Sequence, residues 1–252
     1  MTLASLELPG PRPWVMAHRG ASDLAPENTL GAFALALEHG ADLLETDLWL
    51  SGDGELVCHH DPTLRRMTGD PRRVGQLTAT QLRRLHVRDE TRESHEGVPR
   101  LLELLELTPL EVPVMLEIKD PAIVEPGPLD RLRRILAPRI RERRVGVLCA
   151  SLQWLRRIGA LAPGLVLGHI AMHDPLGARN VDLLGPWWPL LSLNPRYVEH
   201  AHRRGQRVCP LDPRLHRGDH LRRWLALDVD AVLTNDPRRT RAAIEALGGH
   251  RP

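Results

Sequence analysis

The chain has 252 residues, of which 42% are hydrophobic and 26% are charged. Its 34 basic and 32 acidic residues leave a formal net charge of +2, so no broad basic field argues for a nucleic-acid partner. No apolar run approaches the roughly 20 residues of a membrane-spanning helix, and residues 1–13 lack the pattern of a signal peptide, so we expect a cytoplasmic protein without stable membrane insertion.

Short apolar strands alternate with amphipathic helices, a pattern typical of a parallel sheet covered by helices. In chain order, strands are expected at residues 14–17, 42–48, 114–118, 145–149, 165–170, 190–193, 207–209 and 231–233. Helices are expected between Asn28, as the N-cap, and Gly40, and at residues 127–142, 151–162, 195–204, 219–227 and 237–247. The chain has no G-x-G-x-x-G or Walker loop, which argues against a nucleotide-binding sheet.

One interval, residues 51–112, is far longer than an ordinary connection between a strand and a helix. It contains a short expected strand at 55–58 and an Arg-rich helix near 78–85. Because an α/β barrel commonly uses about 250 residues, we predict the α/β class, as a single (β/α)8 TIM barrel with an insertion between strand 2 and strand 3. Such an excursion lies over the mouth of a barrel, where it would cover a substrate.

The three cysteines of the chain are far apart in the sequence. We interpret Cys58, Cys149 and Cys209 as reduced thiols inside strands, because an odd number at these spacings fits neither a disulfide framework nor a zinc cluster.

Ionisable residues follow three of the expected strands, at the ends where barrels carry their active sites. His18 ends the first strand, Glu45 and Asp47 end the second, and Glu117 and Lys119 end the strand at 114–118. Since strand side chains alternate between faces, Glu45 and Asp47 point the same way, as do Glu117 and Lys119. Three carboxylates that converge in apolar surroundings offer only oxygen ligands, which predicts a divalent cation, Mg²⁺ or Ca²⁺.

Histidines next to these carboxylates supply candidate proton-transfer groups. His18 and His60 are the candidate acid and base, since one neutral and one protonated ring could activate a nucleophile and protonate a leaving alkoxide. His59 is the competing choice within its pair, although alternation puts it on the opposite face. Which histidine is the acid stays open at this point.

Two cations near the strand ends could hold a phosphate group. Arg19 could bind it through two donors and Lys119 as a point charge, although each could instead pair with a carboxylate of the site. Glu27 could equally contact the site or be an acid in the first turn of a helix. Carboxylates for a hard cation, two histidines and a phosphate clamp together suit the hydrolysis of a phosphate ester.

The combination of these residues resembles the glycerophosphodiester phosphodiesterase family. The matching stretches are Ala17-His18-Arg19-Gly20, Pro26-Glu27-Asn28-Thr29, Glu45-Thr46-Asp47, Asp53-Gly54 before Val57, His60-Asp61, Leu116-Glu117-Ile118-Lys119, Leu193-Asn194-Pro195 and Asp230 with Thr234-Asn235-Asp236-Pro237. The resemblance implies a barrel domain at residues 13–247, with the insertion at about 51–112, an N-terminal extension at 1–12 and a C-terminal tail at 248–252.

The resemblance also implies an activity and a set of roles. Glycerophosphodiesters would be hydrolysed to sn-glycerol 3-phosphate and an alcohol, as a step of lipid and glycerol metabolism. The implied roles are catalysis by His18 and His60, substrate binding by Arg19 and Lys119, and binding of Mg²⁺ or Ca²⁺ by Glu45, Asp47 and Glu117. The chain departs from the family pattern at Ser151-Leu152 and at Val208-Cys209-Pro210-Leu211-Asp212, where a family aromatic residue is missing.

Two other functions compete with this interpretation. A lysophospholipase D-like hydrolase of lysolipids would need an apolar rim, which Trp187-Trp188 or residues 101–107 could form if they did not simply pack in the core. A barrel that binds a phosphate ligand without turnover would be favoured if a catalytic histidine were missing, but both are present. The sequence leaves open the head group, the cation, the oligomeric state, and whether water or a substrate hydroxyl attacks first.

Overall fold

The structure is a computed structural model that describes residues 6, 8, 11–89, 92 and 94–248. Most of the predicted N-terminal extension (1–12) and of the predicted tail (248–252) lies outside these residues, so the predicted domain limits stay predictions. Within the described part of the chain, no helix is both long enough and apolar enough to cross a membrane.

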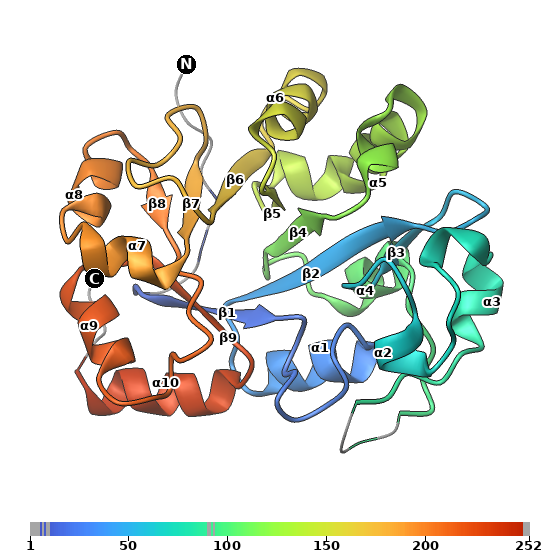
Figure 1. The fold of residues 1–252 in the computed structure, drawn as a ribbon, viewed down its shortest axis with the longest axis horizontal. Coiled ribbons are helices and arrows are strands. Elements are labelled where there is room, and N and C mark those ends of the chain that lie inside the picture. The colour runs from blue at the N-terminus through green and yellow to red at the C-terminus, as the bar shows by residue number, and fades with distance from the viewer. Residues whose placement is uncertain (1–5, 7, 9–10, 90–91, 93, 249–252) are drawn as a thin grey trace.

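Eight parallel strands of the described chain form a nearly closed barrel (Figure 1). They are β1 (Trp14–His18), β2 (Leu43–Leu50), β4 (Val114–Ile118), β5 (Val145–Cys149), β6 (Val166–Ala171), β7 (Leu183–Pro186), β8 (Arg207–Val208) and β9 (Ala231–Thr234). Their order around the barrel is β8-β7-β6-β5-β4-β2-β1-β9, with each neighbouring pair hydrogen-bonded. The predicted (β/α)8 barrel is therefore confirmed.

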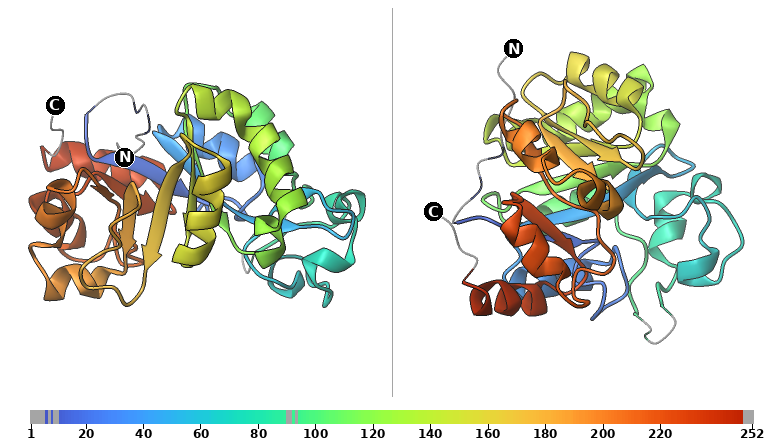
Figure 2. Two further views of the ribbon diagram at one scale, coloured as in Figure 1. Left: turned by 90° about the horizontal axis from the view of Figure 1, so that it is seen from above. Right: turned by 60° about the vertical axis from the view of Figure 1, so that its left-hand side comes forward.

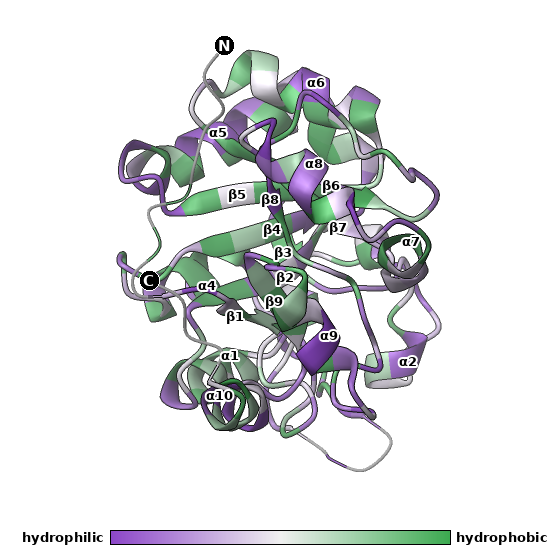
Figure 3. Cartoon of the chain, turned by 90° about the vertical axis from the view of Figure 1, so that its left-hand side faces the viewer, coloured by the Kyte–Doolittle hydropathy of each residue, from purple (hydrophilic) through white to green (hydrophobic). Residues whose placement is uncertain are grey.

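Helices surround the barrel on its outside (Figure 2). They are α1 (Leu30–Glu38), α5 (Pro126–Arg141) after the 3-10 turn η2 (Pro121–Val124), α6 (Leu152–Leu161), α7 (Trp188–Leu193), α8 (Tyr197–His202), α9 (His220–Ala226) and α10 (Pro237–Ala246). In Figure 3 the central strands β4 and β5 are mainly hydrophobic, whereas the surrounding helices contain many hydrophilic residues. This distribution is the one expected when helices cover a sheet that is buried on both faces.

Alternation along the strands divides the apolar side chains into two clusters. Residues inside the barrel, such as Met16, Leu43 and Met115, pack with one another. Their neighbours Leu44 and Leu116 point the other way and pack against the helices. The next inward positions on these three strands are polar, so the inside of the barrel changes from apolar to ionisable toward the carboxyl ends of the strands.

The insertion between β2 and β4 lies at one side of the barrel (Figure 2). It contains β3 (Leu56–Cys58), antiparallel to β2, then α2 (Arg65–Thr68), η1 (Val74–Gln76), α3 (Ala79–Arg83) and α4 (Leu101–Leu107). Val57, Leu64 and Met67 belong to an apolar cluster of its own, whereas Leu101 and Leu104 join the cluster between barrel and helices. Helix α4 therefore packs in the core and does not form an apolar rim.

Two local predictions are wrong. Residues 190–193 belong to helix α7, and the strand lies earlier, at Leu183–Pro186. The sequence gives a weak signal for that strand because Gly185 and Pro186 are both of types that are rare inside strands. Pro189, in turn, suits the first turn of the helix that follows. The N-cap of α1 is Thr29, whose hydroxyl accepts a hydrogen bond from Ala32 N, and not Asn28.

Two other local predictions are confirmed. Gly40 follows the C-cap of α1 with a φ of 74°, the left-handed conformation typical of that position. Cys58, Cys149 and Cys209 are free, buried thiols, although only Cys58 and Cys149 lie inside strands and Cys209 directly follows β8.

Candidate active site

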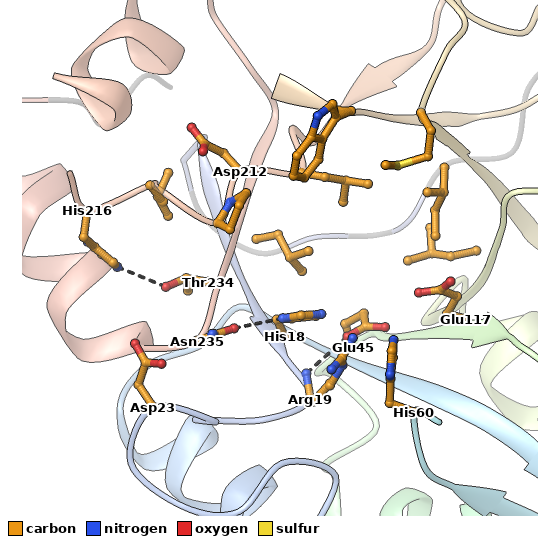
Figure 4. A pocket seen from close by; sticks show the side chains of 18 of the residues that line it. His18, Arg19, Asp23, Glu45, His60, Glu117, Asp212, His216, Thr234 and Asn235 are labelled. Carbon is orange, nitrogen blue, oxygen red and sulfur yellow. Dashed lines mark hydrogen bonds between the residues drawn. The ribbon is translucent and has the colours of Figure 1, made fainter. Parts of the chain in front are cut away.

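The strand register brings the predicted site residues to one level of the barrel. His18 on β1 pairs with Glu45 on β2, and Asp47 on β2 pairs with Glu117 on β4. These residues continue the inward-facing series that begins with Met16, Leu43 and Met115, so their side chains enter the barrel at its carboxyl end. Figure 4 shows His18, Glu45 and Glu117 in this arrangement. The convergence that the alternation pattern predicts is therefore present.

Glu45, Asp47 and Glu117 form a compact acidic cluster. One ligand oxygen from each lies within 4.8 Å of the other two. Glu45 and Asp47 are fully buried, with relative exposures of 1% and 0%. Glu45 Oε1 and Asp47 Oδ1 have no hydrogen-bond donor in the described structure, which is uncommon for buried carboxylate oxygens.

The three carboxylates of the acidic cluster are not all stable in the charged form in their buried surroundings. Burial, together with the charges of Asp47 and Glu117, raises the pKa of Glu45 well above its usual range. Burial and Asp47 also raise the pKa of Glu117. The pKa of Asp47 is lowered although burial opposes this, because Arg19 and Lys119 favour its charged form. One member of the cluster is thus held charged while its two neighbours resist ionisation.

The acidic cluster has the properties expected of a site for a divalent cation. Two buried carboxylate oxygens have no hydrogen-bond donor among the described residues, and all the ligand atoms that the cluster offers are oxygens. A cation would also offset the repulsion between the carboxylates, which contributes to the raised pKa values of Glu45 and Glu117. Hard cations such as Mg²⁺ and Ca²⁺ prefer this kind of ligand set.

Both predicted phosphate-binding cations are paired with the cluster. Arg19 Nε lies 3.0 Å from Asp47 Oδ2 without hydrogen-bond geometry, and Arg19 N donates to Glu45 Oε2 at 3.1 Å. Lys119 Nζ lies 2.5 Å from Glu117 Oε1 and 3.3 Å from Asp47 Oδ1. Arg19 and Lys119 therefore do form ion pairs with carboxylates of the site. Both residues also line the cavity, where their remaining N–H donors can bind an anion.

His18 has its two ring nitrogens in different surroundings. Nδ1 lies 2.8 Å from Asn235 Oδ1, and since that oxygen can only accept, Nδ1 carries the proton (Figure 4). Burial, with a smaller effect of Arg19, lowers the pKa of His18 to about 4. The ring is therefore expected to be uncharged at neutral pH, and its Nε2, which has no hydrogen-bond partner among the described residues, can accept a proton in the cavity.

His60 and His59 differ as alternation predicts. His60 lines the cavity, and its Nδ1 lies 2.7 Å from Asp61 Oδ1. His59 is buried away from the cavity, with Nε2 3.2 Å from Thr63 O, and burial lowers its pKa. Of the two, His60 is the one that can meet a ligand.

The site opens into a cavity of about 980 Å³. Besides the ionisable residues, apolar side chains from the strands β5, β6 and β9 and from the segments directly after β6, β7 and β8 form much of its wall. They are Leu148, Ile170, Met172, Trp187, Leu211, Leu215 and Leu233. Of the rim residues suggested by the sequence, Trp187 lines the cavity, whereas the 101–107 segment does not.

Sequence reasoning assigned no role to several polar residues of the site and left Glu27 undecided. Those that line the cavity are Asp23, Asp212, His216, Arg217, Thr234, Asn235 and Arg239. Asn235 follows β9 and orients the ring of His18. Its signals in the sequence were its position directly after a barrel strand and its place in the matching stretch Thr234-Asn235-Asp236-Pro237. Glu27 does not line the cavity, but its carboxylate accepts from Arg19 Nη1 at 3.1 and 3.2 Å. Glu27 therefore touches the site through Arg19.

Comparison with known proteins adds an independent line of evidence. Residues 18–239 match the model of the glycerophosphoryl diester phosphodiesterase family. The chain is 31% identical over 238 residues to a glycerophosphodiester phosphodiesterase of Caldanaerobacter subterraneus, covering 88% of this chain and 94% of the relative. It is 34% identical over 269 residues to the probable glycerophosphodiester phosphodiesterase 1 of Mycobacterium tuberculosis, covering 97% of each chain.

Solved structures share the fold. A phosphodiesterase of Oleispira antarctica, determined in complex with its product sn-glycerol 3-phosphate, superimposes with a TM-score of 0.78. The match covers 92% of this chain and 97% of the other at 24% identity, so it establishes the likeness of the fold.

Proposed function

The chain belongs to the glycerophosphoryl diester phosphodiesterase family, and we propose that it hydrolyses glycerophosphodiesters to sn-glycerol 3-phosphate and an alcohol with a divalent cation and two histidines. Family membership makes it a phosphoric diester hydrolase. A small-molecule substrate agrees with the product that the Oleispira antarctica enzyme binds in the same fold.

One observation carries the proposal. The three carboxylates of Glu45, Asp47 and Glu117 converge within 4.8 Å, and one buried oxygen each of Glu45 and Asp47 has no hydrogen-bond donor among the described residues. Glu45 and Glu117 line the cavity that His18 and His60 also line, and Asp47 is buried beside them. A cluster of this kind without neighbouring proton-transfer groups would support cation binding alone. The combination supports hydrolysis of a phosphate ester.

Mg²⁺ or Ca²⁺ would be held by Glu45, Asp47 and Glu117, where it would polarise the phosphoryl oxygens and offset negative charge. Arg19 and Lys119 bind the phosphate from the same side, using donors that their carboxylate partners leave unoccupied. These contacts orient the diester so that the bond to be broken lies near the histidines.

The two histidines are matched to opposite tasks. His18 is neutral at pH 7, since its pKa is about 4, and Asn235 fixes the tautomer that leaves Nε2 able to accept a proton from the nucleophile. His60 is the other histidine that lines the cavity, and Asp61 Oδ1, 2.7 Å from its Nδ1, orients the ring. We therefore assign the base to His18 and the acid, which protonates the leaving oxygen, to His60.

The test measures release of sn-glycerol 3-phosphate from glycerophosphocholine and glycerophosphoethanolamine with Mg²⁺, Ca²⁺ or EDTA. Release should depend on the cation, and His18→Ala should lower kcat by about 10²- to 10⁴-fold, the usual range for one proton-transfer group. Glu45→Gln should lower activity and also weaken the rise in unfolding temperature that the cation causes in the wild type, because it removes one charged ligand.

His86→Ala is the matched control, since His86 is exposed in the insertion and does not line the cavity. Its activity should equal that of the wild type. Release that survives EDTA, or a His18→Ala enzyme as active as the control, would contradict the proposal. Cation binding without any turnover would favour the phosphate-ligand binder instead.

A second candidate activity, hydrolysis of lysolipids, is favoured by the apolar wall of the cavity. Trp187, Leu211 and Met172 face the same space as the acidic cluster, and Met172 is 41% exposed. An acyl chain could bury apolar area there, whereas a small polar head group could not. A rate that rises steeply when lysophosphatidylcholine forms micelles, with little turnover of glycerophosphocholine, would favour this activity.

A further inference from the structure

A continuous series of ion pairs joins the two sides of the active site through the insertion. Arg19 Nη1 contacts Glu27 Oε2 at 3.1 Å, and Glu27 Oε1 accepts from Arg66 Nη2 at 2.6 Å. Arg66 Nε in turn lies 2.6 Å from Asp61 Oδ2, and Asp61 Oδ1 lies 2.7 Å from His60 Nδ1. Arg66 is the centre of this series, because its guanidinium binds both carboxylates at once.

Arg66 is held in place by the packing of the insertion. It lies on the short helix α2, between Leu64 and Met67, which are buried in the apolar cluster of the insertion. Gly69, with a φ of 76°, ends this helix, and its N–H bonds back to Arg65 O at 3.0 Å. The guanidinium therefore reaches toward Glu27 and Asp61 from a fixed backbone.

Each carboxylate that Arg66 binds orients one group of the active site. Trp49 Nε1 donates to His60 O at 3.0 Å and fixes the backbone there, but Asp61 is the partner that the described structure provides for the ring of His60. Glu27 accepts a hydrogen bond from Arg19 Nη1, whereas Asp47 contacts a different atom of the same guanidinium, Arg19 Nε. Turning either carboxylate would thus turn His60 or Arg19.

We propose that Arg66 is a positioning residue that sets the ring of His60 and the guanidinium of Arg19 through one bridge between Asp61 and Glu27. The assignment rests on the proposed phosphodiesterase function, in which His60 transfers a proton and Arg19 binds phosphate. It makes the insertion part of the catalytic apparatus in two ways, because α2 supplies the bridge and the segment after β3 supplies His60.

A simple surface ion pair is the competing explanation. The Arg66 side chain is 47% exposed, and exposed pairs contribute little to stability. Arg72 and Asp70 form such a pair nearby, but Asp70 contacts no residue of the site in the described structure. Arg66 differs because both of its partners are themselves bonded to residues that line the cavity.

The test compares Arg66→Met with Arg65→Met. Met keeps most of the aliphatic stem and removes the guanidinium. Arg65 is the adjacent, exposed arginine of α2 and has no carboxylate partner among the described residues, so it serves as the matched control. Three quantities are measured: kcat and KM for glycerophosphocholine, the unfolding temperature, and the NMR signal of the His60 Nδ1 proton, assigned by its loss in His60→Asn.

We expect Arg66→Met to lower kcat/KM by about 10- to 100-fold relative to Arg65→Met, at an unchanged unfolding temperature, since small misplacements of reacting groups have effects of this size. The His60 Nδ1 signal should broaden or vanish, because Asp61 loses its restraint. Combining Arg66→Met with Asp61→Asn should reduce kcat by less than the product of the two single effects, as expected for residues that act through one another.

Two outcomes would overturn the assignment: kcat/KM within twofold of Arg65→Met, or a loss of activity with the His60 signal intact. If the wild type hydrolyses no diester at all, the proposed function fails, and the NMR signal then decides the positioning role by itself. A signal lost in Arg66→Met and kept in Arg65→Met supports the bridge, and a signal kept in both overturns it.

Discussion

The acid–base assignment depends on how different the surroundings of two histidines are. His18 is half-buried in the cavity wall beside Arg19, so its neutral form is favoured, and Asn235 holds one tautomer. His60 faces the same cavity with a carboxylate behind it. The opposite roles that we propose for these two chemically identical rings therefore follow from their different neighbours.

This difference predicts the titration of His18. Its pKa lies at about 4 in the folded enzyme and at an ordinary value near 6.5 in the unfolded chain. The folded state therefore binds fewer protons between these values, and the free energy of unfolding should fall as the pH drops from about 6.5 to about 4. NMR titration of the ring in the cation-free enzyme should give a midpoint near 4, and a midpoint near 6.5 would contradict the assignment.

At the scale of elements, the turn after β1 determines where Arg19 lies. Arg19 and Gly20 have φ values of 57° and 85°, and Ala21 N bonds to Ala32 O at 2.9 Å, which ties the turn to α1. A Cβ on Gly20 would lie 2.6 Å from Ala32 C. Glycine is required here both for the left-handed backbone and for the close approach of the helix.

We predict that Gly20→Ala lowers the free energy of unfolding by about 2–4 kcal/mol, because it adds both strain and overlap with backbone atoms. Urea denaturation measures the change. Gly127→Ala is the control: its new Cβ would meet no atom within 4 Å, and it lies in the first turn of α5, so stability should stay equal or rise slightly. Equal stability of the two variants would contradict this account of the turn.

For the whole molecule, the decisive feature is the seam where the barrel closes. Strands β8 and β9 end the strand order without pairing, and Asp230 bridges them. Its N–H bonds to Val208 O at 2.9 Å, and its Oδ2 accepts from Val208 N at 2.8 Å. The same carboxylate is bound by Arg12 and His202, at 2.7 and 2.8 Å. One residue, Asp230, thus joins the two ends of the strand order through both its backbone and its buried side chain.

We predict that Asp230→Ala lowers the free energy of global unfolding by about 3–5 kcal/mol, the usual result of removing one partner from a buried charged network. Asp219→Ala is the control, because the Asp219 side chain is 87% exposed and its contact with Arg222 is 3.9 Å long. That change should stay within about 0.5 kcal/mol. Thermal and urea unfolding followed by circular dichroism measure both, and a loss below 1 kcal/mol for Asp230→Ala would contradict the role of the seam.

Local periodicity made much of the protein predictable. Alternation along three strands was enough to place Glu45, Asp47 and Glu117 together and to prefer His60 over His59, because each strand side chain takes its face from its neighbours in the chain. The repeated strand–helix pattern was enough to predict the barrel. It failed at residues 190–193, where the short, mostly apolar stretch Leu-Leu-Ser-Leu is as compatible with a helix as with a strand.

Only the tertiary structure decided which distant residues complete the site. Asn235 lies 217 positions from His18, and Arg66 lies 39 positions from Glu27, so neither contact leaves a local pattern in the sequence. Closure of the barrel brings β9 beside β1, and packing of the insertion brings α2 beside the loop after β1. The sequence by itself identified the groups to which we assign the proposed chemistry, whereas closure and packing decided what orients them, because orientation depends on contacts between segments far apart in the chain.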